Sequence, residues 1–252
     1  MQPSWDYTTL AATYDKRPDY SDEAIERLLA GLGLDPRRPL VDVGAGTGKL
    51  TVALARRGYQ IVAVEPNDAM RELGEQNTTG LGVRWIAATG EATTLPDAFA
   101  QLAIFGSSFN VTDRPRALRE SARILVPTGW FACLWNHRDL DDPLQSQVEA
   151  VIARMVPSYD YGVRREDQAE IIEASGLFGP VQRLEGRFVA RVPAGDYLTA
   201  WRSHATLYRQ AAGDARFEEI MHAISAAVAG HDPLQVPYTT RVWYAQRRLT
   251  AP

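Results

Sequence analysis

The segment Leu40-Val41-Asp42-Val43-Gly44-Ala45-Gly46-Thr47-Gly48-Lys49-Leu50 decides the fold of this chain. Its apolar first residues are typical of a short buried strand, and the alternating glycines predict a tight turn that leads into a helix. Glycine has no Cβ atom, so a ligand is able to lie directly on this stretch of backbone. The turn also directs the N–H groups at the start of the helix toward such a ligand.

Two acidic residues indicate the kind of ligand. Asp42 precedes the first glycine by two residues, and the glycine spacing is G-x-G-x-G. A dinucleotide fingerprint has the spacing G-x-G-x-x-G and needs no acid there, whereas an acid suits a cationic group. Glu65 ends a second apolar run, about 20 residues beyond the glycines, where an acid binds the ribose hydroxyls of a nucleoside cofactor. The pair predicts a nucleoside with a positively charged amino-acid tail, of which S-adenosylmethionine is the commonest.

The pattern along the chain predicts an α/β fold. Five apolar runs, expected to be strands, alternate with amphipathic stretches, expected to be helices, and such alternation indicates a parallel sheet with helices on both faces. Ligands of such sheets bind outside the carboxyl ends of the strands. The expected strands are 40–43, 61–64, 83–87, 102–105 and 130–135, and the expected helices are 21–32, 49–57, 68–76 and 116–125.

The C-terminal part has a different pattern. Helices are expected over 143–155 and 166–175, and further helical stretches over about 196–211 and 214–229. Strands are expected near 181–192 and over 238–244, the latter rich in β-branched and aromatic residues. About 45 residues separate these two strands, too many for a simple loop.

Several motifs together resemble the class I S-adenosylmethionine-dependent methyltransferases, in particular the branch that acts on small molecules. The resemblance covers most of the chain and rests on Tyr14 to Tyr20, Val41 to Gly48, Glu65 to Met70, Glu91 to Pro96, Leu125 to Trp130 and Trp135 to Asp139. It implies a doubly wound, mostly parallel seven-stranded, Rossmann-like sheet whose last two strands form a hairpin. We therefore expect one domain over residues 1–252, with cap helices inserted at 143–156 and 196–229.

The resemblance also implies which residues bind the cofactor, S-adenosylmethionine, and its product, S-adenosylhomocysteine. Arg17 and Tyr14 are expected to close over the methionine end, Glu65 to bind the ribose, and Met70 either to pack on the adenine or to belong to the core. The full expected set is Tyr14, Arg17, Asp42, Gly44, Ala45, Gly46, Gly48, Glu65, Pro66, Met70, Thr89, Gly90, Glu91, Phe105, Gly106 and Ser107. Thr89 stands where the family often has an acid or a threonine, so no carboxylate bond to the adenine amino group is carried over.

Fewer sequence features indicate where the methyl acceptor binds. The family branch often carries Phe-His-Trp after its fourth strand, whereas this chain has Phe109-Asn110-Val111. His137 and His204 are the candidate general bases because histidine titrates near neutral pH, although a lone histidine more often serves packing or the surface. Asn110, Trp201 and Tyr208 are the candidate substrate contacts, with a place in the core as the alternative for the two aromatic residues.

Composition narrows the choice of partner and compartment. The net charge is −4 with no long basic run, which argues against nucleic acid. No apolar run approaches the roughly 18 residues that span a membrane, and the segment Met1 to Asp6 has no signal-peptide pattern. The single cysteine, Cys133, lies in an apolar run and suits a reducing cytoplasm. No metal is expected, and the oligomeric state is left open.

These features predict a methyltransferase that transfers the sulfonium methyl group in line to a small-molecule acceptor. Two rivals remain. One is a protein that binds S-adenosylmethionine only as structure, since no obvious base is present. The other is a nicotinamide-dependent oxidoreductase, against which the glycine spacing and Asp42 count. The identity of the acceptor, and the choice between O-, N- and C-methylation, are not encoded in any motif.

Overall fold

The computed structural model describes residues 8–160 and 166–249. The segment Met1 to Asp6, discussed above for signal peptides, lies outside the described residues. No helix in the described part has the length and apolar composition needed to span a membrane.

A seven-stranded sheet with the order β3-β2-β1-β4-β5-β7-β6 forms the centre of the molecule. The strands are β1 (Leu40–Val43), β2 (Ile61–Val64), β3 (Arg84–Ile86), β4 (Ala100–Gly106), β5 (Leu125–Arg138), β6 (Gln182–Val192) and β7 (Leu234–Gln246). The first five are parallel, whereas β7 is antiparallel to both β5 and β6. The doubly wound sheet and its terminal hairpin, both expected from the sequence, are confirmed.

The helices precede or follow strands much as the sequence pattern predicts. They are α1 (Ala11–Tyr14), α2 (Asp22–Leu32), α3 (Lys49–Ala55), α4 (Asp68–Asn77), α5 (Arg114–Ile124), α6 (Pro143–Met155), α7 (Ala169–Ala174), α8 (Ala194–Arg202), α9 (Ala205–Ala211) and α10 (Asp214–Ala227), with short 3-10 helices η1 (Thr8–Leu10) and η2 (Phe109–Val111). Capping sets several boundaries: Ser21 accepts a hydrogen bond from the Ala24 N–H, and Gly33 ends α2 in a left-handed conformation.

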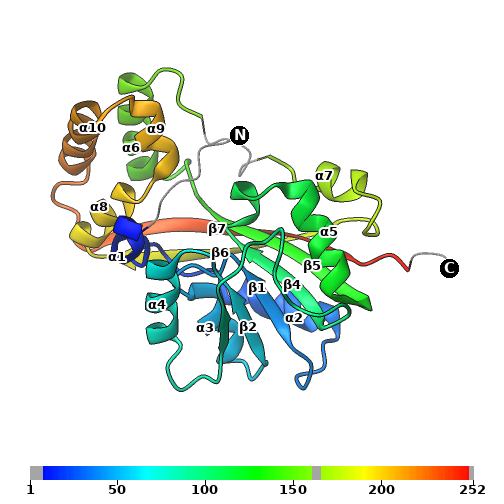
Figure 1. Cartoon of the computed structure of the whole chain (residues 1–252). Helices are drawn as coiled ribbons and strands as arrows, with labels where there is room; N and C mark the ends of the chain where they lie inside the picture. Colours follow the sequence, from blue (N-terminus) through cyan, green and yellow to red (C-terminus); the bar gives the residue numbers. More distant parts are fainter. Residues whose placement is uncertain (1–7, 161–165, 250–252) are drawn as a thin grey trace.

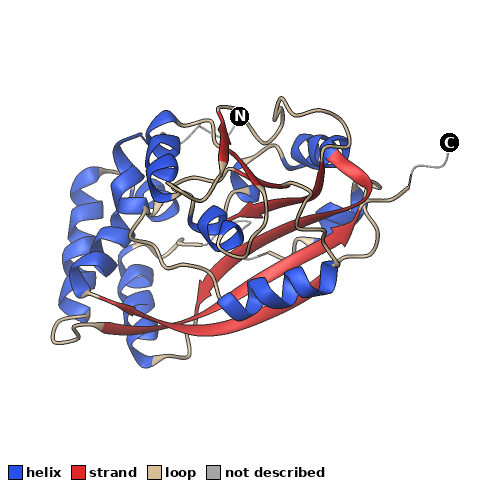
Figure 2. Ribbon diagram, turned by 90° about the horizontal axis from the view of Figure 1, so that it is seen from below, coloured by secondary structure: helices blue, strands red, loops and turns tan. Residues whose placement is uncertain are grey.

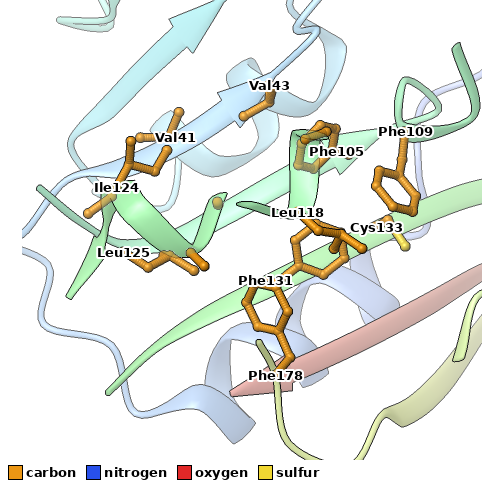
Figure 3. Packing of buried hydrophobic residues seen from close by; sticks show 14 of the residues in the cluster. Val41, Val43, Phe105, Phe109, Leu118, Ile124, Leu125, Phe131, Cys133 and Phe178 are labelled. Atoms are coloured by element: carbon orange, nitrogen blue, oxygen red, sulfur yellow. The ribbon is translucent and has the colours of Figure 1, made fainter. Parts of the chain in front are cut away.

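Side chains alternate between the two faces of the sheet, and each face has its own hydrophobic core. On one face Val41, Phe105 and Phe131 pack with residues of α5 (Figure 3), and residues of α7 belong to the same cluster. On the other face Leu40, Ile104 and Leu134 pack with residues of α2 and α3. Cys133, which the sequence places in an apolar run, is fully buried in the first core. Both faces are therefore covered, as a parallel sheet requires.

A third hydrophobic cluster joins α6, α8, α9 and α10 at one end of the sheet (Figure 1). We call these four helices the helical unit. Strands β6 and β7 are longer than β1 to β4 and extend to it (Figure 2). Helix α8 begins directly after β6. Helices α8, α9 and α10 therefore occupy the interruption of the β6–β7 hairpin that the sequence indicates, whereas α6 joins the unit from between β5 and α7.

One expected element differs. The sequence predicts a single helical stretch over about 196–211, but the structure has two helices, α8 and α9. Ser203 ends α8, and the His204 side chain caps α9 by accepting the Leu207 N–H. A histidine in this role is not a common cap, so the break is hard to predict from helical periodicity alone.

Candidate functional site

A cleft lies at the carboxyl ends of β1 and β4, between the sheet and the helical unit. Five parts of the chain line it: the segment before α2, the glycine turn, the segment after β4, the end of β5 with the start of β7, and helices α8 and α9. The lining residues that the sequence predicts are Tyr14, Arg17, Asp42, Gly44, Ala45, Gly46, Gly106, Ser107, Asn110, His137, Trp201 and His204. The structure thus brings residues from both ends of the chain to one cleft.

The glycine turn is shaped partly by its own neighbours. Gly44 has a φ of +66°, and a Cβ there would lie 2.5 Å from the Ser108 Cβ, so the chain itself requires glycine. At Gly46 a Cβ would meet the Met70 methyl group at 3.2 Å and Tyr14 at 3.9 Å. Gly48 caps α3 beside Trp85 and does not line the cleft. The close approach of a ligand therefore concerns the backbone from Gly44 to Gly46.

Asp42 is the most unusual charged group of the cleft. It is fully buried, and its Oδ2 accepts a hydrogen bond of 2.6 Å from the Thr51 hydroxyl. Its Oδ1 is also buried but has no hydrogen-bond partner among the described residues. Burial raises the pKa of Asp42 to about 7, the Thr51 hydroxyl opposes that change, and the charge of Glu65 adds to it. Such a carboxylate is strongly stabilised by a cation or donor that reaches its open oxygen.

Glu65 lies just after β2 and fixes the glycine turn. Its Oε2 accepts the Gly46 N–H and its Oε1 accepts the Asn67 N–H, both at 2.9 Å. Burial raises its pKa, and these two backbone bonds oppose the increase. Each carboxylate oxygen keeps a further lone pair, so these bonds leave Glu65 able to accept from another donor. Pro66 follows it directly, at the same edge of the sheet.

The other residues expected around the adenine lie apart from the lining of the cleft. Met70 is buried, with its methyl group against the glycine turn. Thr89 bridges to Ala92 across a tight turn, and Gly90 packs against Val43 and Phe105. Glu91 accepts the Asp113 N–H at 2.7 Å, next to the start of α5.

The segment after β4 contributes a hydroxyl pair. Tyr20 donates a hydrogen bond of 3.0 Å to the Ser107 Oγ. Burial raises the pKa of Tyr20 well above its usual range, so its hydroxyl stays protonated and remains a donor. The Phe105 side chain is fully buried and packs on Phe109 and Phe131 in the core (Figure 3), and Phe105 does not line the cleft.

Arg17 connects the two walls of the cleft. Its guanidinium lies 4.1 Å above the Tyr14 ring and donates to the Ser203 hydroxyl at 2.9 Å and to the Ser203 carbonyl at 2.6 Å. The arginine expected at the methionine end therefore already spans to α8. Its expected contact with a carboxylate stays a prediction.

The candidate histidines line the cleft in different ways. His137 is buried near the end of β5, opposite Thr239 of β7. His204 lies at the start of α9, and its Nδ1 accepts the Leu207 N–H at 3.4 Å. In that arrangement a neutral His204 carries its proton on Nε2, which favours donation over proton abstraction by Nε2.

The two aromatic candidates of the helical unit also differ. Trp201 lines the cleft although its side chain is only 5% exposed, because most of it packs in the core of the helical unit. Arg138 lies over its indole ring at 4.4 Å. Tyr208 does not line the cleft: its hydroxyl donates to Asp214, and its ring packs on Phe217. Asn110 lines the cleft and accepts a hydrogen bond from the Trp135 indole.

Several lining residues are missing from the sequence predictions. Tyr20 and Arg138 lie within the quoted motifs, so the motifs themselves provided a signal for them. Arg209 and Tyr238 lie in segments without a motif, and only the fold brings them to the cleft. No group of three or more metal-ligating side chains is present among residues 8–160 and 166–249.

Comparison with curated proteins finds methyltransferases. An uncharacterized methyltransferase of Mycobacterium tuberculosis, Rv3342, is 35% identical over 141 residues, which make up 54% of this chain and 54% of the relative. The chain therefore spans about half the length of this relative. The ubiquinone/menaquinone biosynthesis C-methyltransferase UbiE of Cronobacter sakazakii is 29% identical over 60% of this chain and 65% of the relative.

Solved structures share the fold over nearly the whole chain. A candidate type II methyltransferase from Anaeromyxobacter dehalogenans has a TM-score of 0.60 and 22% identity, over 92% of this chain and 98% of the other. Geranyl diphosphate C-methyltransferase from Streptomyces coelicolor, solved with Mg²⁺, geranyl diphosphate and S-adenosylhomocysteine, has a TM-score of 0.56 and 15% identity, over 97% and 99%. Residues 41–133, which carry the glycine turn and both acids, match the family model described as a methyltransferase domain. The match over residues 41–133 confirms the resemblance to methyltransferases that the motifs indicate.

Proposed function

We propose that the chain binds S-adenosylmethionine in the cleft and transfers its methyl group to a small-molecule acceptor. The observation that carries this proposal is the buried Oδ1 of Asp42, which has no partner among the described residues and lies beside the glycine turn. An ammonium group that reaches this oxygen would compensate the buried charge. A dinucleotide would instead place its negative pyrophosphate at the turn near Asp42, which is unfavourable.

The same reasoning assigns the remaining cofactor contacts. Glu65 has lone pairs for the ribose hydroxyls while it holds the Gly46 N–H. Gly106, Ser107 and the Tyr20 hydroxyl line the cleft and would contact the methionine part, although the Ser107 N–H already donates to the Leu134 carbonyl at 2.9 Å. The adenine would then extend out of the cleft past the glycine turn, toward Met70, Thr89, Gly90 and Glu91, which lie outside the cleft lining.

The helical unit supports a role as a cap in one methyltransferase domain. Trp201 and His204 come from it to the cleft, whereas His137 comes from the sheet. When bound, S-adenosylmethionine supplies a methyl group that its sulfonium already activates. The protein then has to align the acceptor and exclude water, and alignment alone contributes several kcal/mol. This arrangement needs no metal.

A small-molecule acceptor fits the shape of the cleft and the net charge of the chain. The cleft is bounded on one side by the sheet and on the other by α8 and α9, and the net charge of −4 does not favour nucleic acid. The relatives named for ubiquinone/menaquinone biosynthesis and for geranyl diphosphate methylation support the same class of acceptor. A cytoplasmic location is part of the proposal and rests on the single, buried cysteine.

Calorimetric titration of the purified protein with S-adenosylhomocysteine and with NAD tests the cofactor. We expect binding of S-adenosylhomocysteine and none of NAD, and the reverse result would overturn the proposal. Incubation with methyl-labelled S-adenosylmethionine and pooled bacterial metabolites then tests the reaction. Label in a small-molecule product supports a methyltransferase, whereas binding without any labelled product supports the rival in which the cofactor is structural.

A further inference from the structure

The charged residues that line the cleft are unevenly distributed in sign. Asp42 is the single acidic side chain among the described lining residues, and it lies at the glycine turn. The basic lining residues are Arg17, Lys49, Arg138 and Arg209. Among the described side chains that line the cleft, basic ones therefore outnumber acidic ones.

Three of the four basic side chains already have protein partners. Arg17 donates to Ser203 as described, and the Lys49 ammonium lies 3.1 Å from the Asp19 carboxylate. Arg138 donates to Gln145 at 3.2 Å and to Glu149 at 3.1 Å, both on α6. These contacts fix the three groups in the walls of the cleft.

Arg209 differs from these three. Its side chain is exposed, and it makes no hydrogen bond or ion pair with any described residue. It lies in the last turn of α9, four positions after Ala205, which also lines the cleft. Because positions four apart share one helix face, Arg209 belongs to the cleft side of α9, whereas Leu207 and Ala211 face the core of the helical unit.

Aromatic rings are a second feature of the cleft lining. Trp135, Tyr197, Trp201 and Tyr238 line the cleft together with Arg209. Trp135 and Trp201 are 3% and 5% exposed, so their rings are fixed by packing. Rigid aromatic walls accept a flat or extended apolar group, and a planar guanidinium at the rim pairs with an anionic group in two parallel hydrogen bonds.

From this arrangement we propose that the acceptor combines an apolar body with one anionic group, a carboxylate, phosphate or sulfonate, and that Arg209 binds this group. The inference rests on the proposed function, because it names the class of acceptor that the cleft takes. It makes Arg209 a residue that determines specificity, without a part in the methyl transfer itself. Neutral molecules of the same shape would lose the ion pair, and cationic ones would be repelled.

A pair of fluorescent probes tests the anionic requirement without knowledge of the acceptor. 8-Anilinonaphthalene-1-sulfonate and N-phenyl-1-naphthylamine share one apolar body, and only the first carries an anionic group. We expect Arg209→Gln, in the presence of saturating S-adenosylhomocysteine, to weaken binding of the sulfonate about five- to tenfold and to leave binding of the neutral probe unchanged. Arg209→Lys should retain part of the affinity, because it keeps the charge but loses the planar fork.

Arg191→Gln is the matched control, because it removes the same charge from an exposed position of β6 outside the cleft. It should leave both probes unaffected. An Arg209→Gln protein that binds the sulfonate as tightly as the unmodified protein overturns the inference, as does an equal loss for both probes. If S-adenosylhomocysteine fails to bind the unmodified protein, the proposed function fails, and the comparison of the two probes still decides the role of Arg209.

A second experiment addresses the natural acceptor. Products of the labelling reaction with bacterial metabolites are separated on an anion-exchange resin. We expect the methyl label in the retained, anionic fraction, and a strong reduction of that label with Arg209→Gln but not with Arg191→Gln. Label only in the unretained fraction overturns the inference. Absence of label from every fraction counts against the proposed function, while the probes continue to test the anionic site.

Discussion

Arg17 donates hydrogen bonds to both the hydroxyl and the carbonyl oxygen of Ser203, 186 positions further along the chain. The first residue lies before α2, and the second ends α8. Lys16 strengthens the same connection through an ion pair with Asp196 at 3.2 Å. The segment before α2 and the helical unit are therefore joined at the cleft, which links the position of α8 to that of the N-terminal segment.

Removal of this connection should loosen the helical unit. Arg17→Ala deletes both bonds to Ser203, and we expect a loss of about 1–3 kcal/mol in unfolding free energy, because the bonds are charge-assisted and partly buried. Amide exchange in residues 194–211 should become faster. Ser203→Ala keeps the carbonyl acceptor and should cost less than Arg17→Ala. If amide exchange in residues 194–211 is as slow in both variants as in the unmodified protein, the contact does not hold α8 in place.

The raised pKa of Asp42 predicts how stability and cofactor affinity change with pH. Its pKa is raised from 3.8 to about 7, so the folded protein binds this proton more tightly than the unfolded chain does. The contribution of Asp42 to stability is therefore fully present below the lower value, decreases as pH rises between the two values, and stays constant above about 7. Affinity for S-adenosylhomocysteine should have the opposite trend and increase as pH rises through about 7, because the carboxylate attracts the ammonium group of the ligand.

Asp42→Asn provides the control for this prediction. It should abolish the increase in affinity between pH 6 and 8, weaken binding at pH 8, and leave the protein at least as stable there, since it removes a buried charge. Calorimetry at several pH values and thermal unfolding of the ligand-free protein measure the two effects. A variant with unchanged affinity and unchanged pH dependence would show that the open oxygen of Asp42 does not contact the ligand.

Glu65→Ala should weaken binding of S-adenosylhomocysteine about ten- to a hundredfold, because charge-assisted bonds to two hydroxyls contribute roughly 1.5–3 kcal/mol. The structure adds a second effect: the Gly46 and Asn67 N–H groups lose their acceptor, so a moderate loss of stability is also expected. Glu72→Ala, at an exposed position of α4, is the control. Equal affinities of the two folded variants, measured by calorimetry, would exclude Glu65 from the ribose site.

Local sequence patterns were sufficient to predict most of the sheet and of the glycine turn. The apolar strand before Gly44 and the starts of the helices predicted at 21–32 and 68–76 are decided within a few residues of chain, and the structure has these elements, with Ser21 and Asn67 as the helix caps. The extension of β5 to Arg138 was not predicted, because its last residues are polar and are held by pairing with β7, about 100 positions later. Pairing over such a distance leaves no trace in a local pattern.

In the candidate site, too, some features follow from local sequence and others depend on residues that are distant in the chain. Asp42 was recognised because it sits in the strand that ends at the turn, but its open oxygen depends on Thr51 bonding to only one side of the carboxylate. Tyr208, a candidate from helical spacing, turns to Asp214 instead of the cleft, and Arg209, the next residue, lines it. The break between α8 and α9 at Ser203 and His204 rotates this helix relative to a continuous one, and periodicity alone does not reveal that rotation.

Trp201 is expected to determine which acceptor is used. Its indole lines the cleft, yet it packs against Tyr197 and His204 and lies under the Arg138 guanidinium. Trp201→Ala would leave a cavity in the helical unit and is expected to cost about 3–5 kcal/mol, so a loss of activity in that variant would be ambiguous. Trp201→Phe keeps an aromatic ring in the core and mainly reduces the aromatic surface that faces the cleft.

We therefore expect Trp201→Phe to change KM or kcat for the acceptor severalfold, with little change in affinity for S-adenosylhomocysteine. Phe217→Leu is a suitable control, because Phe217 belongs to the same core but does not line the cleft. It should lower thermal stability without a comparable change in acceptor kinetics. If Trp201→Phe is folded and has the acceptor kinetics of the unmodified protein, Trp201 only packs the helical unit. If amide exchange in residues 194–211 also fails to respond to ligands, the unit is scaffold, and its assignment as a cap is wrong.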